Sequence, residues 1–153
     1  MFRWIGFSAL LVVVLTGTTT VAVGKEEIKD PNVSYRVNVM RSIGSNMGGI
    51  GDILKNNLPF QEALATHARN IESSGKLVAM AFEKEAKDPA STALPDIWKD
   101  FAKFKAGTDE MVKAAGAFAA ATESGDKGRI MGALKELGGT CKECHKAFRE
   151  KRN

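Results

Sequence analysis

Apolar side chains recur at alternating intervals of three and four residues in four separate runs between residues 31 and 151. This spacing places them along one face of an α-helix, which completes a turn every 3.6 residues. No stretch shows the strict alternation of apolar and polar residues that indicates a half-buried β-strand. The sequence therefore predicts an all-α fold.

Capping and turn-forming residues set the limits of the four predicted helices. The helices are expected to run from Pro31, behind the cap Asp30, to a stop at 56–59; from Leu64 to Phe82; from Asp96 to the turn at 124–126; and from about Asp126 to Lys151. The inward face of the first helix is expected to carry Val33, Val37, Met40, Gly44, Met47, Gly51 and Leu54, and that of the second Leu64, Ala68, Ile71, Gly75, Val78 and Phe82. The third is expected to carry Ile97, Phe101, Phe104, Met111, Ala115 and Phe118, and the fourth Ile130, Leu134, Leu137, Cys141, Cys144 and Phe148.

Two short connections and one longer one join these helices. Helices of this length with such connections are typical of an antiparallel up-down-up-down four-helix bundle. The chain of 153 residues is long enough to bury a core as one domain. We therefore predict a single four-helix domain over residues 25–153.

The first 24 residues have a different character. Arg3 precedes an apolar run from Trp4 to Leu15, and a threonine-rich stretch leads to the small residues Ala22-Val23-Gly24. This order predicts a signal peptide over residues 1–24 that directs the protein to the periplasm, with cleavage after Gly24 or, as the second choice, after Ala22. A retained membrane anchor is the alternative, because the apolar stretch could just span a bilayer.

The only two cysteines of the chain lie near its C-terminal end, in Cys141-Lys142-Glu143-Cys144-His145. On a helix, Cys141 and His145 lie one turn apart on a shared face, with Cys144 at its neighbouring edge. C-x-x-C-H is the attachment signature of c-type haem. We predict one haem c, bound covalently through Cys141 and Cys144, with His145 as an iron ligand.

Three other uses of the cysteine pair are less favoured. A disulfide would close a very short loop and stabilise little. A thioredoxin-like redox pair would require a βαβ context, which is missing from this sequence. A zinc site would need a fourth ligand, and the only other histidine, His67, is far away in the sequence. We expect His67 to be structural.

From about residue 32 to residue 152 the chain resembles the class II cytochromes c, the cytochrome c′ family. The resemblance lies in Tyr35-Arg36, in Ile97-Trp98 and in the segment from Cys141 to Arg149. It implies a four-helix bundle, an Arg36 side chain that approaches a haem propionate, and a basic Arg149 beside the iron-ligating histidine. For Arg36, the simpler alternative is a solvated side chain on the helix surface. We expect Trp98 to pack between helices.

Within the family that the chain resembles, function depends on the side of the haem that faces away from His145. A sulfur ligand there implies a low-spin electron carrier, whereas an apolar cover implies a five-coordinate, high-spin iron that binds nitric oxide or carbon monoxide. Met40 matches this position, four residues after Arg36, and Met/His ligation suits electron transfer. We expect Met40 to ligate the iron and the protein to carry electrons. The alternative is a gas-binding protein in which Met40 only fills space.

The remaining expectations concern reactions and partners. The sequence shows no distal histidine–arginine pair, so we expect no enzymatic activity. Removal of residues 1–24 takes away one arginine and lowers the net charge from +4 to +3, too weakly basic to predict nucleic-acid binding. Basic residues around the attachment site predict an acidic redox partner, unless they only complement the helix dipole; these are Lys142, Lys146, Arg149, Lys151 and Arg152. The sequence leaves monomer and homodimer open.

Overall fold

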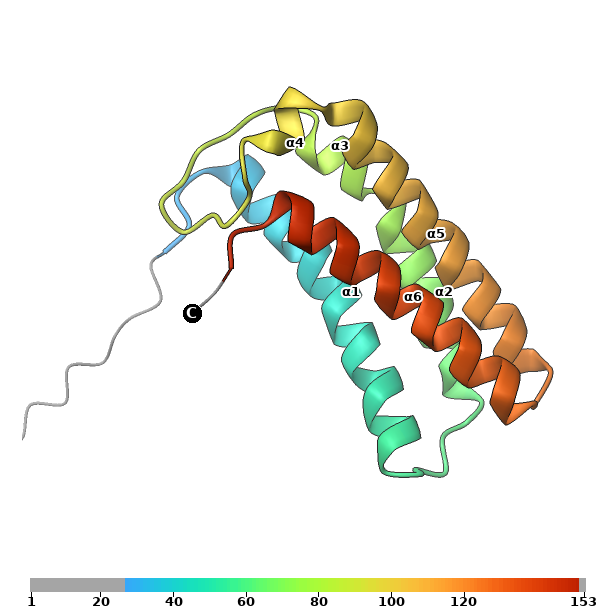
Figure 1. Cartoon of the computed structure of the whole chain (residues 1–153). Helices are drawn as coiled ribbons and strands as arrows, with labels where there is room; N and C mark the ends of the chain where they lie inside the picture. The colour runs from blue at the N-terminus through green and yellow to red at the C-terminus, as the bar shows by residue number, and fades with distance from the viewer. Residues whose placement is uncertain (1–26, 152–153) are drawn as a thin grey trace, which may run out of the picture.

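The computed structural model describes residues 27–151 and shows a bundle of long antiparallel helices (Figure 1). The predicted signal peptide lies outside the described residues. The helices are α1 (Pro31–Lys55), α2 (Ala63–Gly75), α3 (Val78–Phe82), α4 (Asp96–Lys99), α5 (Phe101–Glu123) and α6 (Lys127–Phe148). Residues 27–151 contain no β-strand, so the predicted all-α up-down-up-down bundle is confirmed.

Three aspartates cap the three long helices. Asp30 accepts hydrogen bonds from the backbone N–H groups of Asn32 and Val33 at the start of α1, as predicted. Asp100 and Asp126 cap α5 and α6 in the same way. These carboxylates satisfy backbone donors that have no partner within the helix, and their negative charge is favourable at that end of the helix dipole.

The second and third predicted helices are each divided in two. The second consists of α2 and α3, separated by Lys76 and Leu77. The third consists of α4 and α5, because Asp100 leaves the helical conformation (φ −135°, ψ 66°) in order to cap α5. The spacing of apolar residues continues across both breaks, so the sequence pattern did not predict them.

The fourth helix ends at Phe148, three residues before the predicted end. Beyond it the backbone is extended and pairs with the loop that follows α3. The Leu94 N–H donates to the Phe148 carbonyl oxygen (3.0 Å), and the Glu150 N–H donates to the Thr92 carbonyl oxygen (2.8 Å). These bonds give the last backbone groups partners outside the helix and fasten the loop to the end of α6.

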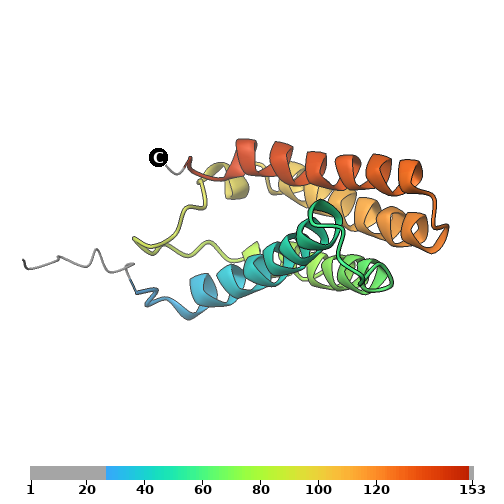
Figure 2. The ribbon, with the colours of Figure 1, turned by 90° about the horizontal axis from the view of Figure 1, so that it is seen from below.

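The long helices pack in sequence: α1 against α2, α2 against α5, and α5 against α6. The helices α1 and α6 do not close this ring with comparable packing. They cross in Figure 1, but Figure 2 shows them apart at the crossing, with the loop over residues 83–95 at the open end. The bundle is therefore densely packed around α2 and α5 and open between α1 and α6.

This opening corrects the predicted inward face of α1. Val33 is buried as predicted, but the other buried apolar residues are Val39, Ile43, Ile50 and Ile53. The predicted Val37, Met40, Met47 and Leu54 are half-buried, and Gly44 and Gly51 are exposed. The helix presents one apolar stripe to α2 and a second, neighbouring stripe to the opening. The predicted stripe is largely the second.

His67 has the structural role expected of it. Its Nδ1 lies 2.9 Å from the Asn46 side-chain oxygen, and its ring lies directly on the backbone of Gly49. A methyl group on Gly49 would come within 2.8 Å of the imidazole, so any larger residue there would force His67 to shift.

None of the helices in residues 27–151 has the length and apolar character of a membrane span.

Candidate functional site

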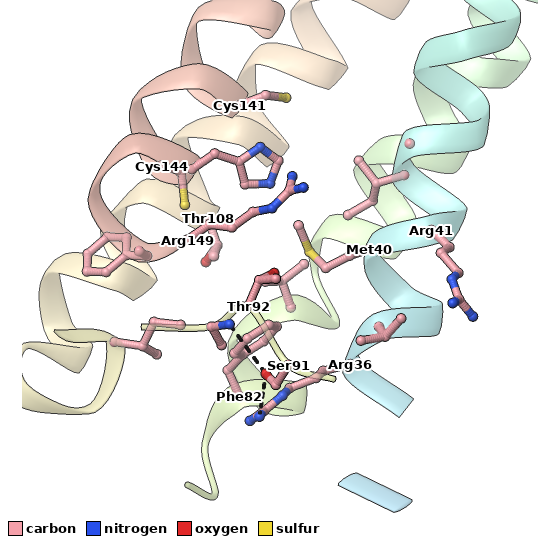
Figure 3. A pocket seen from close by; sticks show the side chains of 18 of the residues that line it. Arg36, Met40, Arg41, Phe82, Ser91, Thr92, Thr108, Cys141, Cys144 and Arg149 are labelled. Carbon is pink, nitrogen blue, oxygen red and sulfur yellow. Dashed lines mark hydrogen bonds between the residues drawn. The ribbon is translucent and has the colours of Figure 1, made fainter. Parts of the chain in front are cut away.

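A cavity of about 1130 Å³ lies between α1 and α6, and every candidate site residue named from the sequence lines it. Arg36 and Met40 reach it from α1, and Cys141, Cys144 and His145 reach it from α6, with Arg149 just beyond the end of that helix (Figure 3). We call this space the α1/α6 cavity. Its volume is slightly larger than that of most sites for small organic ligands, which leaves room for a large one.

The two cysteines are free and half-buried, and both line the α1/α6 cavity. Burial is the main cause that raises the pKa of each thiol above its ordinary value. Raised values keep the thiols protonated, which does not suit a reactive redox pair or a thiolate zinc site. Within residues 27–151, no group of three or more His, Cys, Asp or Glu side chains is placed to hold a metal ion.

His145 is half-buried one turn beyond Cys141, and its imidazole lines the same cavity. Burial lowers its pKa, and the nearby charge of Arg149 lowers it further. Both effects favour the neutral imidazole, which is the form that binds a metal. Two thiols and one neutral imidazole on successive turns of a helix fit the attachment of haem c.

The α1 wall around Met40 is apolar. Met40 points from α1 toward α6 (Figure 3), and Val37 and Met47 line the same wall. A methyl group placed on Gly44 would meet no atom within 4 Å, so the wall is open beside Met40. His145 supplies the only imidazole among the described residues that line the cavity.

Arg36 is buried to 1% exposure, which excludes the solvated arginine considered from the sequence. Its Nη2 donates to the Ala86 carbonyl oxygen (2.6 Å). It also donates, over 3.4 Å, to the Ser91 hydroxyl, as Figure 3 shows. Burial lowers its pKa, and the charges of Asp30 and Asp88 partly oppose this effect. Both of those carboxylates accept hydrogen bonds from backbone amides.

The second terminal nitrogen of Arg36, Nη1, is buried and has no hydrogen-bond partner among the described residues. No carboxylate in residues 27–151 lies within ion-pair distance of this guanidinium. A buried charge with an unsatisfied donor is costly unless a ligand completes it. A carboxylate on a bound group would satisfy Nη1, as the propionates of haem can. The residues of the cavity therefore fit haem at both ends.

Arg149 is half-buried and follows α6 in an extended conformation. Its backbone N–H donates to the His145 carbonyl oxygen (3.1 Å), and its side chain lines the α1/α6 cavity. The structure therefore brings it next to His145, as expected from the sequence. Lys142, Lys146 and Lys151 are exposed beside it, whereas Arg152 lies outside the described residues.

The sequence did not predict the loop residues that close the cavity. Residues 90–93 line it, and Ser91 contacts Arg36. This segment has no helical periodicity, and only its position between two prolines marked it as a loop. Thr108 was also missed; it is 4% exposed and donates to the Lys105 carbonyl oxygen within α5.

Comparison with known proteins gives consistent matches. The family model described as Cytochrome C' matches residues 31–149. A cytochrome c′ from Rhodospirillum rubrum is 37% identical over 141 residues, covering 92% of this chain and 96% of the relative. The crystal structure of cytochrome c′ from Rubrivivax gelatinosus superposes with a TM-score of 0.66 at 30% identity, over 78% of this chain and 94% of that one.

A further similar structure carries a ligand. It is a nitric oxide complex of a cytochrome c′ mutant from Alcaligenes xylosoxidans, with a TM-score of 0.68 and 27% identity. The match covers 78% of this chain and 94% of that chain. The similarity thus extends over nearly the whole described bundle.

Proposed function

The chain belongs to the cytochrome c′ family, whose members carry covalently bound haem c, and we propose that it is a periplasmic haem protein that binds nitric oxide or carbon monoxide. This is the alternative of the two functions expected from the sequence. It ranks above the electron carrier because several relatives, including one aligned over 92% of this chain, are cytochromes c′, and similar structures include nitric oxide complexes of such proteins.

When bound, a single haem c supplies an iron that can take a diatomic gas on the side not occupied by a protein ligand. Cys141 and Cys144 would hold the group through two thioethers, and the neutral imidazole of His145 would be its iron ligand. Arg36 would donate from Nη1 to a propionate. Each of these roles uses a side chain that already lines the α1/α6 cavity.

The observation that carries the proposal is the character of the α1 wall. Next to Met40, the α1 residues Val37, Ile43 and Met47 line the cavity with aliphatic or thioether groups, and space is open at Gly44. Among the described residues beside Met40, thioether sulfur is the only potential iron ligand that this wall offers. A small apolar gas has room beside Met40 without displacement of a strong protein ligand.

One observation favours the electron carrier as a second candidate. The Met40 side chain points into the cavity from the helix that faces His145 (Figure 3). A thioether in that position could ligate the iron, and Met/His ligation raises the haem potential. Met40 therefore decides between the two functions.

The absorption spectrum of the purified protein tests the proposal. We expect a high-spin ferric spectrum at neutral pH and saturable binding of carbon monoxide to the reduced protein. A low-spin ferric spectrum with a weak long-wavelength sulfur-to-iron band, together with negligible carbon monoxide binding, would instead support the electron carrier.

We propose no enzymatic reaction for the cavity, and a peroxide-turnover assay checks this.

If electrons reach the haem from a partner protein, the exposed Lys142, Lys146 and Lys151 favour an acidic partner. Reduction by such a partner should then slow as ionic strength rises, because salt screens the attraction. Rates that do not depend on salt would favour the helix-dipole role of these lysines.

A further inference from the structure

The guanidinium of Arg36 lies against two aromatic side chains. Its Cζ is 5.1 Å from the centre of the Phe82 ring and 5.2 Å from the centre of the Trp98 ring. A cation over an aromatic face within about 6 Å is attracted to it, and the attraction is strongest where water is excluded. Arg36 is 1% exposed, so both contacts are of this desolvated kind.

The two rings are linked to each other and differ in how they are held. The Trp98 indole N–H donates to the Phe82 carbonyl oxygen over 2.7 Å. The Phe82 ring also packs on Phe104 (5.1 Å between ring centres), which in turn meets Phe148 edge-on (5.3 Å). Phe82 is therefore part of the core, whereas Trp98 is half-buried on the short helix α4.

A long arginine side chain with a free buried donor could turn to find another acceptor or reach solvent. The hydrogen bonds from Nη2 to Ala86 and Ser91 oppose this movement, and so does the pair of aromatic rings. Trp98 is not among the residues that line the α1/α6 cavity, so it has no direct access to a ligand there. Any effect of Trp98 on the bound group must pass through Arg36, through Phe82, whose carbonyl oxygen it contacts, or through general packing.

We infer that Trp98 is a positioning residue that holds Arg36 with its Nη1 directed to a carboxylate of the bound haem. The inference rests on the proposed function, because it takes the propionate as the partner of Nη1. It assigns to Trp98 a role beyond the packing between helices expected from the sequence. Removal of the indole should leave the charge of Arg36 in place but weaken its interaction with the carboxylate.

The test is the midpoint potential of the haem-loaded protein with Trp98→Leu, Arg36→Leu and both changes. Arg36→Leu should lower the potential, because an uncompensated carboxylate favours the ferric form. Trp98→Leu should also lower the potential, by an amount that corresponds to about a fivefold decrease in the equilibrium constant for reduction. In the Arg36→Leu background, Trp98→Leu should add nothing. An equal shift in both backgrounds would show that Trp98 acts through packing, and would overturn the inference.

Trp98→Phe separates the ring from its N–H group and guards against a misfolded Trp98→Leu protein. It keeps an aromatic face, so most of the potential should be retained. A loss as large as that of Trp98→Leu would contradict the ring contact. In the diamagnetic carbonmonoxy form, the Arg36 Nε–H proton should show a ring-current shift that Trp98→Leu reduces; an unchanged signal would also count against the inference.

The two proposals fail in different ways. No change in potential on Arg36→Leu would refute the contact with a propionate, and with it the placement of the haem. A change on Arg36→Leu with none on Trp98→Leu would refute only the role of Trp98. Circular dichroism and thermal unfolding of each haem-loaded variant establish that the bundle is intact before the potentials are compared.

Discussion

The face that α2 turns to the bundle and the face that α1 turns to α6 have the same sequence pattern but different surroundings. In α2 and its continuation α3, all six predicted inward residues are buried, from Leu64 to Phe82. On the α1 side, four of the seven predicted residues border the α1/α6 cavity, and only Val33 of the seven is buried. Apolar periodicity therefore identifies surfaces that avoid water, but it does not distinguish a surface covered by protein from one covered by a ligand.

The largest effect should come from removing what the cavity holds. Cys141→Ala together with Cys144→Ala removes both thiols, and we expect complete loss of covalently bound haem. Intact-protein mass and acidic organic extraction measure this directly. Haem that remains attached to the double variant, or that extracts freely from the unmutated protein, would contradict the assignment of the cavity.

The next prediction compares the two apolar stripes on α1 itself. Ile50 is fully buried on the stripe that belongs to the core, and Ile50→Ala should lower the free energy of unfolding by about 2–5 kcal/mol without changing the haem spectrum. Met47 lies on the cavity stripe, and Met47→Ala should change the spectrum or gas binding at a smaller cost in stability. Denaturant unfolding and absorption spectra of both variants test this contrast. Equal effects of both substitutions would mean that the two stripes do not differ in kind.

Met40→Leu sharpens the comparison within the cavity. Leucine has nearly the volume of methionine, so the loss of stability should stay under about 1.5 kcal/mol. If Met40 only covers the haem, the ferric spectrum should remain high-spin, and the rate of carbon monoxide binding should change modestly. Conversion from a low-spin to a high-spin spectrum would instead establish Met40 as an iron ligand.

The smallest effect concerns the loop that closes the open side. Backbone N–H groups of Asp30, Ala90 and Lys29 donate to Asp88 and lower the pKa of its carboxyl group. A lowered pKa means that the carboxylate stabilises the fold above its ordinary pKa, and that this contribution is lost as pH falls through the lowered value. Asp88→Asn should therefore be slightly less stable than the parent at neutral pH, and the difference should vanish in acid. Thermal unfolding against pH, with Lys87→Gln as a neighbouring control, measures it.

Much of the site could be predicted because its residues lie close together in the sequence. Cys141, Cys144 and His145 share one helix, so their spacing alone places them on one side of it. Arg36 and Met40 were assigned only through resemblance, since nothing local to α1 indicates what lies opposite. The loop contacts of Arg36 with Ala86 and Ser91 could not be predicted, because they join residues at least 50 positions apart.

The sequence by itself determined the helical bundle, the Asp30 cap of the first helix and the attachment side of the cavity, because each depends on residues within one or two turns of a helix. Only the tertiary structure decided which apolar stripe of α1 is core, where α6 ends, and that Arg36 is buried with a free donor beside Trp98. These features depend on the distance and angle between helices. Those are set by the packing of α2 and α5 and by the loop over residues 83–95, and not by any local pattern.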